Sequence, residues 1–332
     1  MKRIVFIDIT KAIAVISMVT LHITMGIESV VPKQTIQPYS DLQQYIFLTW
    51  FMAVFFVVTG YCSNYSKPFK PFLKSLIISV GLPIFFFDIL VVNITNFITL
   101  PTSEAFYLLP FSLLRFFRYS FWFLRALFVA KLMYWAINKI LYNRVVSILG
   151  GVILILYILA GIAVLYGHGE HGCHSVMALA LIATGDYVRK NNLLENKMIC
   201  WGSLIIHIIC ITTMYVYSYS PPRIQNSILI HNCFDIPLLY IISVSGSIGI
   251  MFLSKIIGKN NILEYIGRYS LVIYCFHFIV NKLPFSYFIS ENSSLSYCLI
   301  YLICHTIVTI SLCCLFAFVF DRKYLRIVIG KQ

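Results

Sequence analysis

Stretches of about 20 apolar residues recur along this chain, separated by short polar segments. A helix of that length rises about 30 Å and so crosses the hydrocarbon core of a bilayer. With 60% hydrophobic and only 11% charged residues, the chain is too apolar to hide its surface in one core. We therefore expect an all-α, polytopic integral membrane protein. Its ten predicted transmembrane helices are residues 4–24, 43–63, 75–98, 119–138, 145–166, 174–188, 198–217, 235–254, 268–284 and 295–320.

The placement of lysine and arginine predicts the orientation of these helices. If the N-terminus is inside, the inner segments hold 17 of the 25 basic residues, so we expect both termini in the cytoplasm. The net charge of +13 then reflects this bias and predicts no nucleic-acid partner. No soluble domain or internal repeat interrupts the pattern, so we expect a single transmembrane domain over residues 1–332, whose first helix is retained rather than cleaved.

The first predicted helix carries a polar face. Lys11 and His22 are eleven residues apart, which places them about 20° apart around the helix, and Asp8 lies within about 60° of Lys11. A charged group at the bilayer centre costs about 3 kcal/mol, so this face should point to a cavity or to partner helices. The simpler alternative is that Asp8 and Lys11 form an i,i+3 pair near the interface and His22 marks the outer end of the helix.

One further segment is rich in metal-ligating residue types. The stretch YGHGEHGCHS at 166–175 has a composition typical of metal sites, but its glycines and its ligand spacing match no zinc pattern. We expect a loop on the outer side of the membrane, either plain or ligand-binding, and no metal. The ten cysteines are scattered and predict no disulfide framework. Two single histidines on apolar helices are expected to be interior residues with satisfied hydrogen bonds: His207 and His305.

A family resemblance runs through five segments in order. The spacing of Lys11 and His22 in IDITKAIAVISMVTLH resembles the opening motif of the acyltransferase-3 family of membrane-bound O-acyltransferases. Lys11 stands where that family commonly has arginine, and lysine provides a point charge without bidentate geometry. The other similar segments are FMAVFFVVTGY (51–61), FWFLRALFVAKLMYW (121–135), ALIATGDYVRK (180–190) and IGRYSLVIYCFHFIV (266–280), the last with Gly267, Ser270, Tyr274 and His277.

The resemblance implies an enzyme that moves an acyl group from cytoplasmic acyl-CoA to a hydroxyl of a cell-surface polysaccharide or lipid-linked sugar. Acetyl-CoA is the expected donor substrate, succinyl is an alternative acyl group, and no cofactor is expected to stay bound. The implied location is the inner (plasma) membrane, with multiple spans.

Residues of the first helix receive roles within that reaction. We expect His22 to act as the general base on the acceptor hydroxyl, because histidine titrates near neutral pH. A covalent acyl-histidine is the less favoured variant. Lys11 would attract the anionic donor or stabilise developing negative charge, and Asp8 would hold Lys11 in place.

Three lysines follow the second predicted helix, in YSKPFKPFLKS. Lys67, Lys70 and Lys74 form a basic cluster suited to the phosphates of CoA. The first two stand where the resemblance would place arginines. An ordinary positive-inside anchor explains each lysine equally well.

Residues of two later helices complete the predicted site. Arg125 lies three residues after Trp122, on nearly the same face, and either contributes to donor binding or forms a structural pair with Asp88. Trp122, Tyr274 and His277 are expected to line the cavity on the acceptor side. For Tyr274 and His277, packing with a satisfied hydrogen bond is the alternative.

A transporter or flippase of a lipid-linked glycan is the alternative function, since many helices with buried charges also describe a substrate pathway. The missing internal repeats weigh against it. A glycan polymerase is a third possibility. Such enzymes usually place their polar catalytic residues in a large outer loop, and the predicted helices leave no segment long enough for one.

Overall fold

The computed structural model describes residues 3–99, 121–140, 151, 173–224, 228–229, 234–281, 288–322 and 326. Within these ranges the chain is almost entirely helical, as predicted. The helices are α1 (Val5–Glu28), α2 (Lys33–Phe47), α3 (Phe51–Cys62), α4 (Phe69–Leu76), η1 (Ile77–Gly81), α5 (Leu82–Thr99), α8 (Trp122–Ile140), α10 (Cys173–Lys190), η2 (Leu193–Glu195), α11 (Lys197–Val216), α12 (Asp235–Ile257), α13 (Asn261–Arg268), α14 (Ser270–Asn281) and α15 (Leu295–Phe320). A two-residue antiparallel ribbon pairs β1 (Arg223–Ile224) with β2 (Ile228–Leu229).

Six helical segments in the described part of the chain are long and apolar enough to cross a membrane, or seven if the bent pair α13 and α14 forms one span. The predicted spans 119–138 and 174–188 form the helices α8 and α10. Each of these carries three charged residues within about 18 positions, which explains why neither meets the same test. Apart from residue 151, the predicted span 145–166 lies outside the described residues. The ten-span count, the single domain over 1–332 and the cytoplasmic termini therefore stay predictions.

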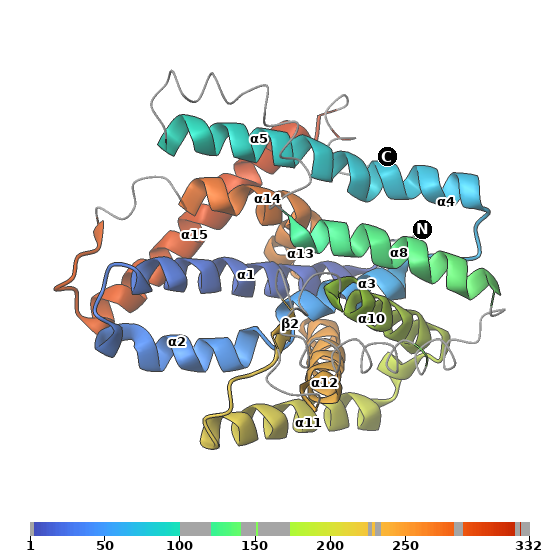
Figure 1. The fold of residues 1–332 in the computed structure, drawn as a ribbon, viewed down its shortest axis with the longest axis horizontal. Coiled ribbons are helices and arrows are strands. Elements are labelled where there is room, and N and C mark those ends of the chain that lie inside the picture. Colours follow the sequence, from blue (N-terminus) through green and yellow to red (C-terminus); the bar gives the residue numbers. More distant parts are fainter. Residues whose placement is uncertain are drawn as a thin grey trace, which may run out of the picture.

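Helix α1 lies in the middle of the bundle (Figure 1). It packs against α2, α3, α12, α13, α14 and α15. Of the 18-residue apolar stretch that could cross the membrane, 67% is buried inside the protein. The corresponding figure for α11, at the edge of the bundle in Figure 1, is 17%. A helix covered on most sides by other helices can carry polar groups that lipid would not accept. The structure thus confirms that the polar face of α1 meets partner helices.

Helices α3 and α10 approach each other through two glycines. A Cβ on Gly60 of α3 would lie 2.0 Å from the carbonyl oxygen of Ile182. A Cβ on Gly185 of α10 would lie 1.9 Å from the carbonyl oxygen of Val57. Small residues let membrane helices pack backbone to backbone. Each glycine belongs to a motif that the sequence singled out, and the two motifs pack on one another.

A third glycine holds the start of α1 against the bent pair of helices. A Cβ on Gly267 of α13 would lie 1.7 Å from the carbonyl oxygen of Asp8, so only glycine permits this contact. After Gly267 the chain turns by 77° at Tyr269, and α14 then contacts α1. The motif at 266–280 therefore packs along the opening motif on α1.

Replacing Gly185 by alanine should disrupt the α3 and α10 contact, because the added methyl group would overlap backbone atoms that cannot move aside. We expect loss of the monodisperse peak in size-exclusion chromatography of the detergent-solubilised protein. The matched control is Gly202→Ala on α11, where a Cβ meets nothing within 4 Å. That variant should elute as wild type, since alanine is also the better helix former. Equal behaviour of the two variants would contradict the packing argument.

Candidate active site along α1

The polar residues of α1 form two groups. Asp8 and Lys11 lie near its start, and His22 lies about 16 Å further along the axis at 1.5 Å per residue. The two groups therefore cannot act on the same atom of a substrate. Each has its own set of neighbours from other helices.

At the start of α1, Asp8 is buried and accepts two basic side chains. The Nε atom of Arg3 lies 2.5 Å from its carboxylate, and the Nζ atom of Lys11 lies 3.5 Å away. Arg3 also donates to the backbone carbonyl of Glu264 at 3.2 Å. The i,i+3 pair between Asp8 and Lys11 is thus present, and Arg3 is the closer partner of the carboxylate.

Further basic residues reach the same end of the bundle from other helices. Lys11, Lys131 and Arg189 all lie within electrostatic range of Cys62 at the end of α3, and so does the carboxylate of Asp8. Within the described part of the chain, no carboxylate forms an ion pair with Lys131, whereas Lys11 and Arg189 each have an aspartate. Lys131 therefore brings a positive charge that its protein surroundings leave uncompensated there, which is a suitable feature for binding an anion.

A buried aspartate organises α10 at this end. The carboxylate of Asp186 is 1% exposed and accepts from the Tyr134 hydroxyl at 2.8 Å. It also lies 2.5 Å from Arg189 and 2.7 Å from Lys190. Arg189 donates in addition to the Ser63 carbonyl at 2.8 Å. Because one carboxylate orients both basic groups, their positions are fixed beside the end of α3.

The three lysines Lys67, Lys70 and Lys74 are exposed on the surface near this end. The backbone carbonyl of Lys67 accepts from the Trp135 indole at 3.0 Å, which ties this segment to α8. Burial raises the pKa of the neighbouring Tyr65, so its phenol adds no charge. The lysine side chains are accessible to an anion, and their role as donor ligands stays a prediction.

At the other end of the polar face of α1, His22 contacts His277 of α14. The Nδ1 atom of His22 lies 3.1 Å from Nε2 of His277. The ring planes are inclined by 24° with centroids 5.0 Å apart, which suits a nearly in-plane hydrogen bond between ring nitrogens. Both of these histidines were predicted site residues, and the structure brings them together across 255 residues of sequence.

The tautomers of the two rings follow from a third atom. The Nδ1 atom of His277 lies 3.1 Å from the backbone carbonyl of Ile273, which can only accept. A neutral His277 therefore carries its hydrogen on Nδ1 and accepts at Nε2. His22 then donates from Nδ1, which leaves the lone pair of its Nε2 available to take a proton. This arrangement is the one that a general base requires.

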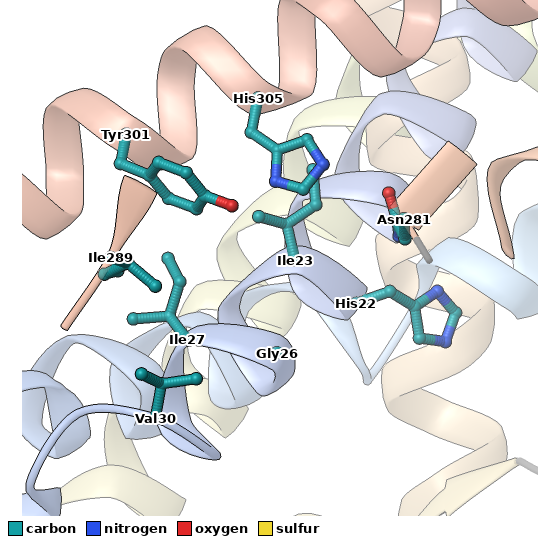
Figure 2. Close-up of a pocket in the computed structure, with 9 residues that line it drawn as sticks. All are labelled: His22, Ile23, Gly26, Ile27, Val30, Asn281, Ile289, Tyr301 and His305. Carbon is teal, nitrogen blue, oxygen red and sulfur yellow. The ribbon is translucent and has the colours of Figure 1, made fainter. Parts of the chain in front are cut away.

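A cavity of about 80 Å³ adjoins His22 between α1 and α15 (Figure 2). Its polar lining comprises His22, Asn281, Tyr301 and His305, and Gly26 and aliphatic side chains complete it. The volume is sufficient for several water molecules or for one small part of a substrate, since a single water needs about 10–15 Å³. The cavity therefore offers space for a reacting group next to the pair of histidines.

The family of the chain was identified by comparison with known protein families. A family model described as an acyltransferase domain matches residues 4–318. The chain belongs to the acyltransferase-3 family. No curated protein and no solved structure gives a match. The family assignment covers essentially the whole described bundle and confirms the resemblance that the motifs predicted.

As a member of this family, the protein is a membrane acyltransferase. Its third motif segment (121–135) holds Arg125, whose guanidinium lies 2.9 Å from the Asp88 carboxylate. The predicted pair between these two residues is thus confirmed, and a donor-binding role for Arg125 stays a prediction. Asp88 is 3% exposed at its side chain, so the pair ties α8 to α5 inside the acyltransferase.

The remaining predicted residues, Trp122 and Tyr274, lie in an aromatic cluster beside the histidine pair. Tyr274 packs against Phe123 and, with ring centroids 6.3 Å apart, against His277. The Trp122 ring meets His174 edge-on, with centroids 6.0 Å apart. The cavity beside His22 is lined by neither Trp122 nor Tyr274. The predicted contact of both residues with the acceptor is untested, and for Tyr274 the packing alternative describes the contacts that its ring makes.

The histidine-rich segment 168–174 lies outside the described residues except for the start of α10. Across the described part of the chain, no three histidine, cysteine or acidic residues come close enough to hold a metal. Sequence reasoning did not assign Lys131, Asp186 or His305 to the site. The nearby basic residues Arg189 and Lys190 gave a weak sequence signal that Asp186 has ion-pair partners. Lys131 and His305 each lie singly on an apolar helix, so the sequence gave no signal for them.

Arg125→Ala should destabilise the acyltransferase, because the buried Asp88 carboxylate loses its guanidinium partner. We expect a loss of about 2 kcal/mol or more, seen as a lower Tm in detergent. The double variant Asp88→Asn with Arg125→Gln should recover much of that loss, because no charge is then left without this partner. A double variant no more stable than Arg125→Ala would show that the pair contributes little.

Proposed function

We propose that this acyltransferase moves an acyl group, acetyl in the first instance, from acyl-CoA to a hydroxyl of a surface polysaccharide or lipid-linked sugar. The observation that carries the proposal is the His22 to His277 hydrogen bond at one end of α1, with the basic cluster at the other end. Donor phosphates and acceptor hydroxyl then bind about 16 Å apart. The protein would lie in the inner membrane, with the Lys11 end and both termini in the cytoplasm.

The donor end is the group formed by Lys11, Lys131 and Arg189. Their combined charge attracts the phosphates of acyl-CoA, which are the anionic part of the donor. Asp8 and Asp186 hold Lys11 and Arg189, respectively, so that these two cations are already placed when the donor arrives. The basic surface continues on the cytoplasmic side, from which the donor would enter, through the exposed lysines Lys67, Lys70 and Lys74. Because Lys11 is far from His22, we assign it to donor binding rather than to the reacting carbonyl.

The chemical step takes place at His22. Its Nε2 removes the proton from the acceptor hydroxyl while that oxygen attacks the thioester carbonyl carbon. The tetrahedral intermediate collapses by breaking the carbon–sulfur bond, and the CoA sulfur leaves with the electron pair. The protonated Nε2 then returns its proton to the sulfur. The products are an ester and free CoA, and His22 is again neutral.

His277 is the positioning residue in this scheme. It accepts the Nδ1 hydrogen of His22 and so fixes the ring and the tautomer. When His22 carries the extra proton, the same hydrogen bond stabilises the imidazolium, because charge-assisted hydrogen bonds are stronger than neutral ones. The acyl-histidine variant would use the same lone pair as a nucleophile, and it stays the less favoured alternative. The family assignment favours an acyltransferase over a transporter or flippase.

The direct test is transfer of radiolabel from [14C]acetyl-CoA by the purified protein in the presence of glycan from its own cells. His22→Ala should lower kcat/KM by about 10²- to 10⁴-fold, the usual contribution of a general base. His277→Leu should lose on the order of tenfold, about the value of one hydrogen bond, and His277→Gln should recover part of this because its amide oxygen can accept from His22.

All variants should elute as wild type from size-exclusion chromatography. Near-normal turnover by His22→Ala would remove the general-base role. A protein that neither binds nor consumes acetyl-CoA would support the transporter instead.

Lys131→Ala and Lys11→Ala should each raise the KM for acetyl-CoA by about tenfold with a smaller change in kcat, because each removes a cation from the phosphate site. Lys11→Arg should stay close to wild type. The matched control is Lys33→Ala, an exposed lysine at the start of α2, which should leave the KM unchanged. An unchanged KM in both Lys11→Ala and Lys131→Ala would place the donor elsewhere.

A further inference from the structure

Residues from three helices, α1, α14 and α15, line the cavity beside His22. His22 and Gly26 come from α1, Asn281 from the end of α14, and Tyr301 and His305 from α15. In Figure 2, Asn281 stands on the side of the cavity where His22 lies, and Tyr301 and His305 project from α15 across from α1. The cavity thus connects α15 with the histidine pair.

The polar lining of this cavity is neutral. Among the described residues that line it, none is aspartate, glutamate, lysine or arginine. The Thr309 hydroxyl donates to the Asn281 amide oxygen at 3.3 Å, so the amide nitrogen is left to donate. The Tyr301 ring packs on His305, with centroids 5.2 Å apart. Aliphatic side chains cover the rest of the wall.

These features fit one class of ligand. A sugar or other polyol has hydroxyl groups for amide and imidazole partners and C–H faces for aromatic and aliphatic side chains. An amine would enter as an ammonium ion at neutral pH, and burying it here would cost several kcal/mol because no carboxylate lines the cavity. An alcohol enters without charge and meets no such penalty.

We infer that the cavity between α1 and α15 is the acceptor subsite, with Asn281, Tyr301 and His305 as its specificity-determining residues. It holds the hydroxyl-bearing part of a neutral polyol and excludes amines, so that the product is an ester and not an amide. This inference rests on the proposed function, because His22 is the base that the bound hydroxyl would meet.

Gly26 lines the cavity and is exposed, so a larger side chain there should narrow the cavity without clashing with neighbouring atoms. A Cβ at Gly26 meets nothing within 4 Å, so Gly26→Leu places its side chain in open space. The matched control is Gly202→Leu on α11, where a Cβ is equally unhindered and no part of this cavity is near. Both variants are introduced into cells that lack the gene, and both are also purified.

Two readouts separate the acceptor from the donor. The first is the acyl group that mild alkali releases from the surface glycans of the cells, since esters are cleaved under these conditions and amides are not. The second is binding of [14C]acetyl-CoA to the purified variants, which depends on the basic end of α1. Gly26→Leu should lower the released acyl group by about tenfold or more and keep donor affinity within about twofold of wild type.

Gly202→Leu should match wild type in both measurements. Normal ester content in Gly26→Leu cells would overturn the acceptor subsite while leaving the proposed function in place. A loss of donor binding as large as the loss of ester would also overturn it. Acyl groups that depend on the gene but resist mild alkali would contradict the exclusion of amines. If the wild-type protein neither binds acetyl-CoA nor adds an acyl group, the proposed function itself fails.

Discussion

The polar face of α1 is the constraint on which the rest of the structure depends. A helix that carries Asp8, Lys11 and His22 along one side cannot present that side to lipid, so other helices must cover it. The cover is not uniform. Near Asp8 it consists of basic groups and the backbone of α13, and near His22 it consists of an imidazole and a neutral cavity. The same face therefore has two chemically different ends.

Close packing of backbones makes this difference possible. Gly60 and Gly185 bring α3 and α10 together, which places Arg189 beside the end of α3. Gly267 brings α13 onto the start of α1, and α14 then delivers His277 to His22. Gly185 and Gly267 lie in motifs that also contain chemical groups, namely Asp186 with Arg189, and His277. The motifs thus specify helix contacts as much as they specify reactive side chains.

Much of the site followed from the sequence, because α1 alone sets the spacing of Lys11 and His22. The Arg125 and Asp88 pair was one of two predicted alternatives, since an arginine inside a membrane helix needs a partner or a polar cavity. The sequence did not predict three further features. These are the hydrogen bond between His22 and His277, the cavity on α15, and Lys131 without an ion-pair partner among the described residues. Each depends on which faces of distant helices meet, and apolar helices carry little pattern to reveal this. Hydropathy also predicted spans over α8 and α10, whose residues Arg125, Arg189 and Lys190 pair with aspartates inside the bundle.

The central claim is that a donor held by the basic cluster extends along α1 and brings its acyl group to His22. A cryo-electron microscopy structure in lipid nanodiscs with a non-hydrolysable ketone analogue of acetyl-CoA tests it most directly. The phosphates should lie beside Lys11 and Lys131, and the acyl carbonyl should lie within reach of Nε2 of His22. A donor bound with its acyl end away from His22, or with α1 sealed along its length, would contradict it.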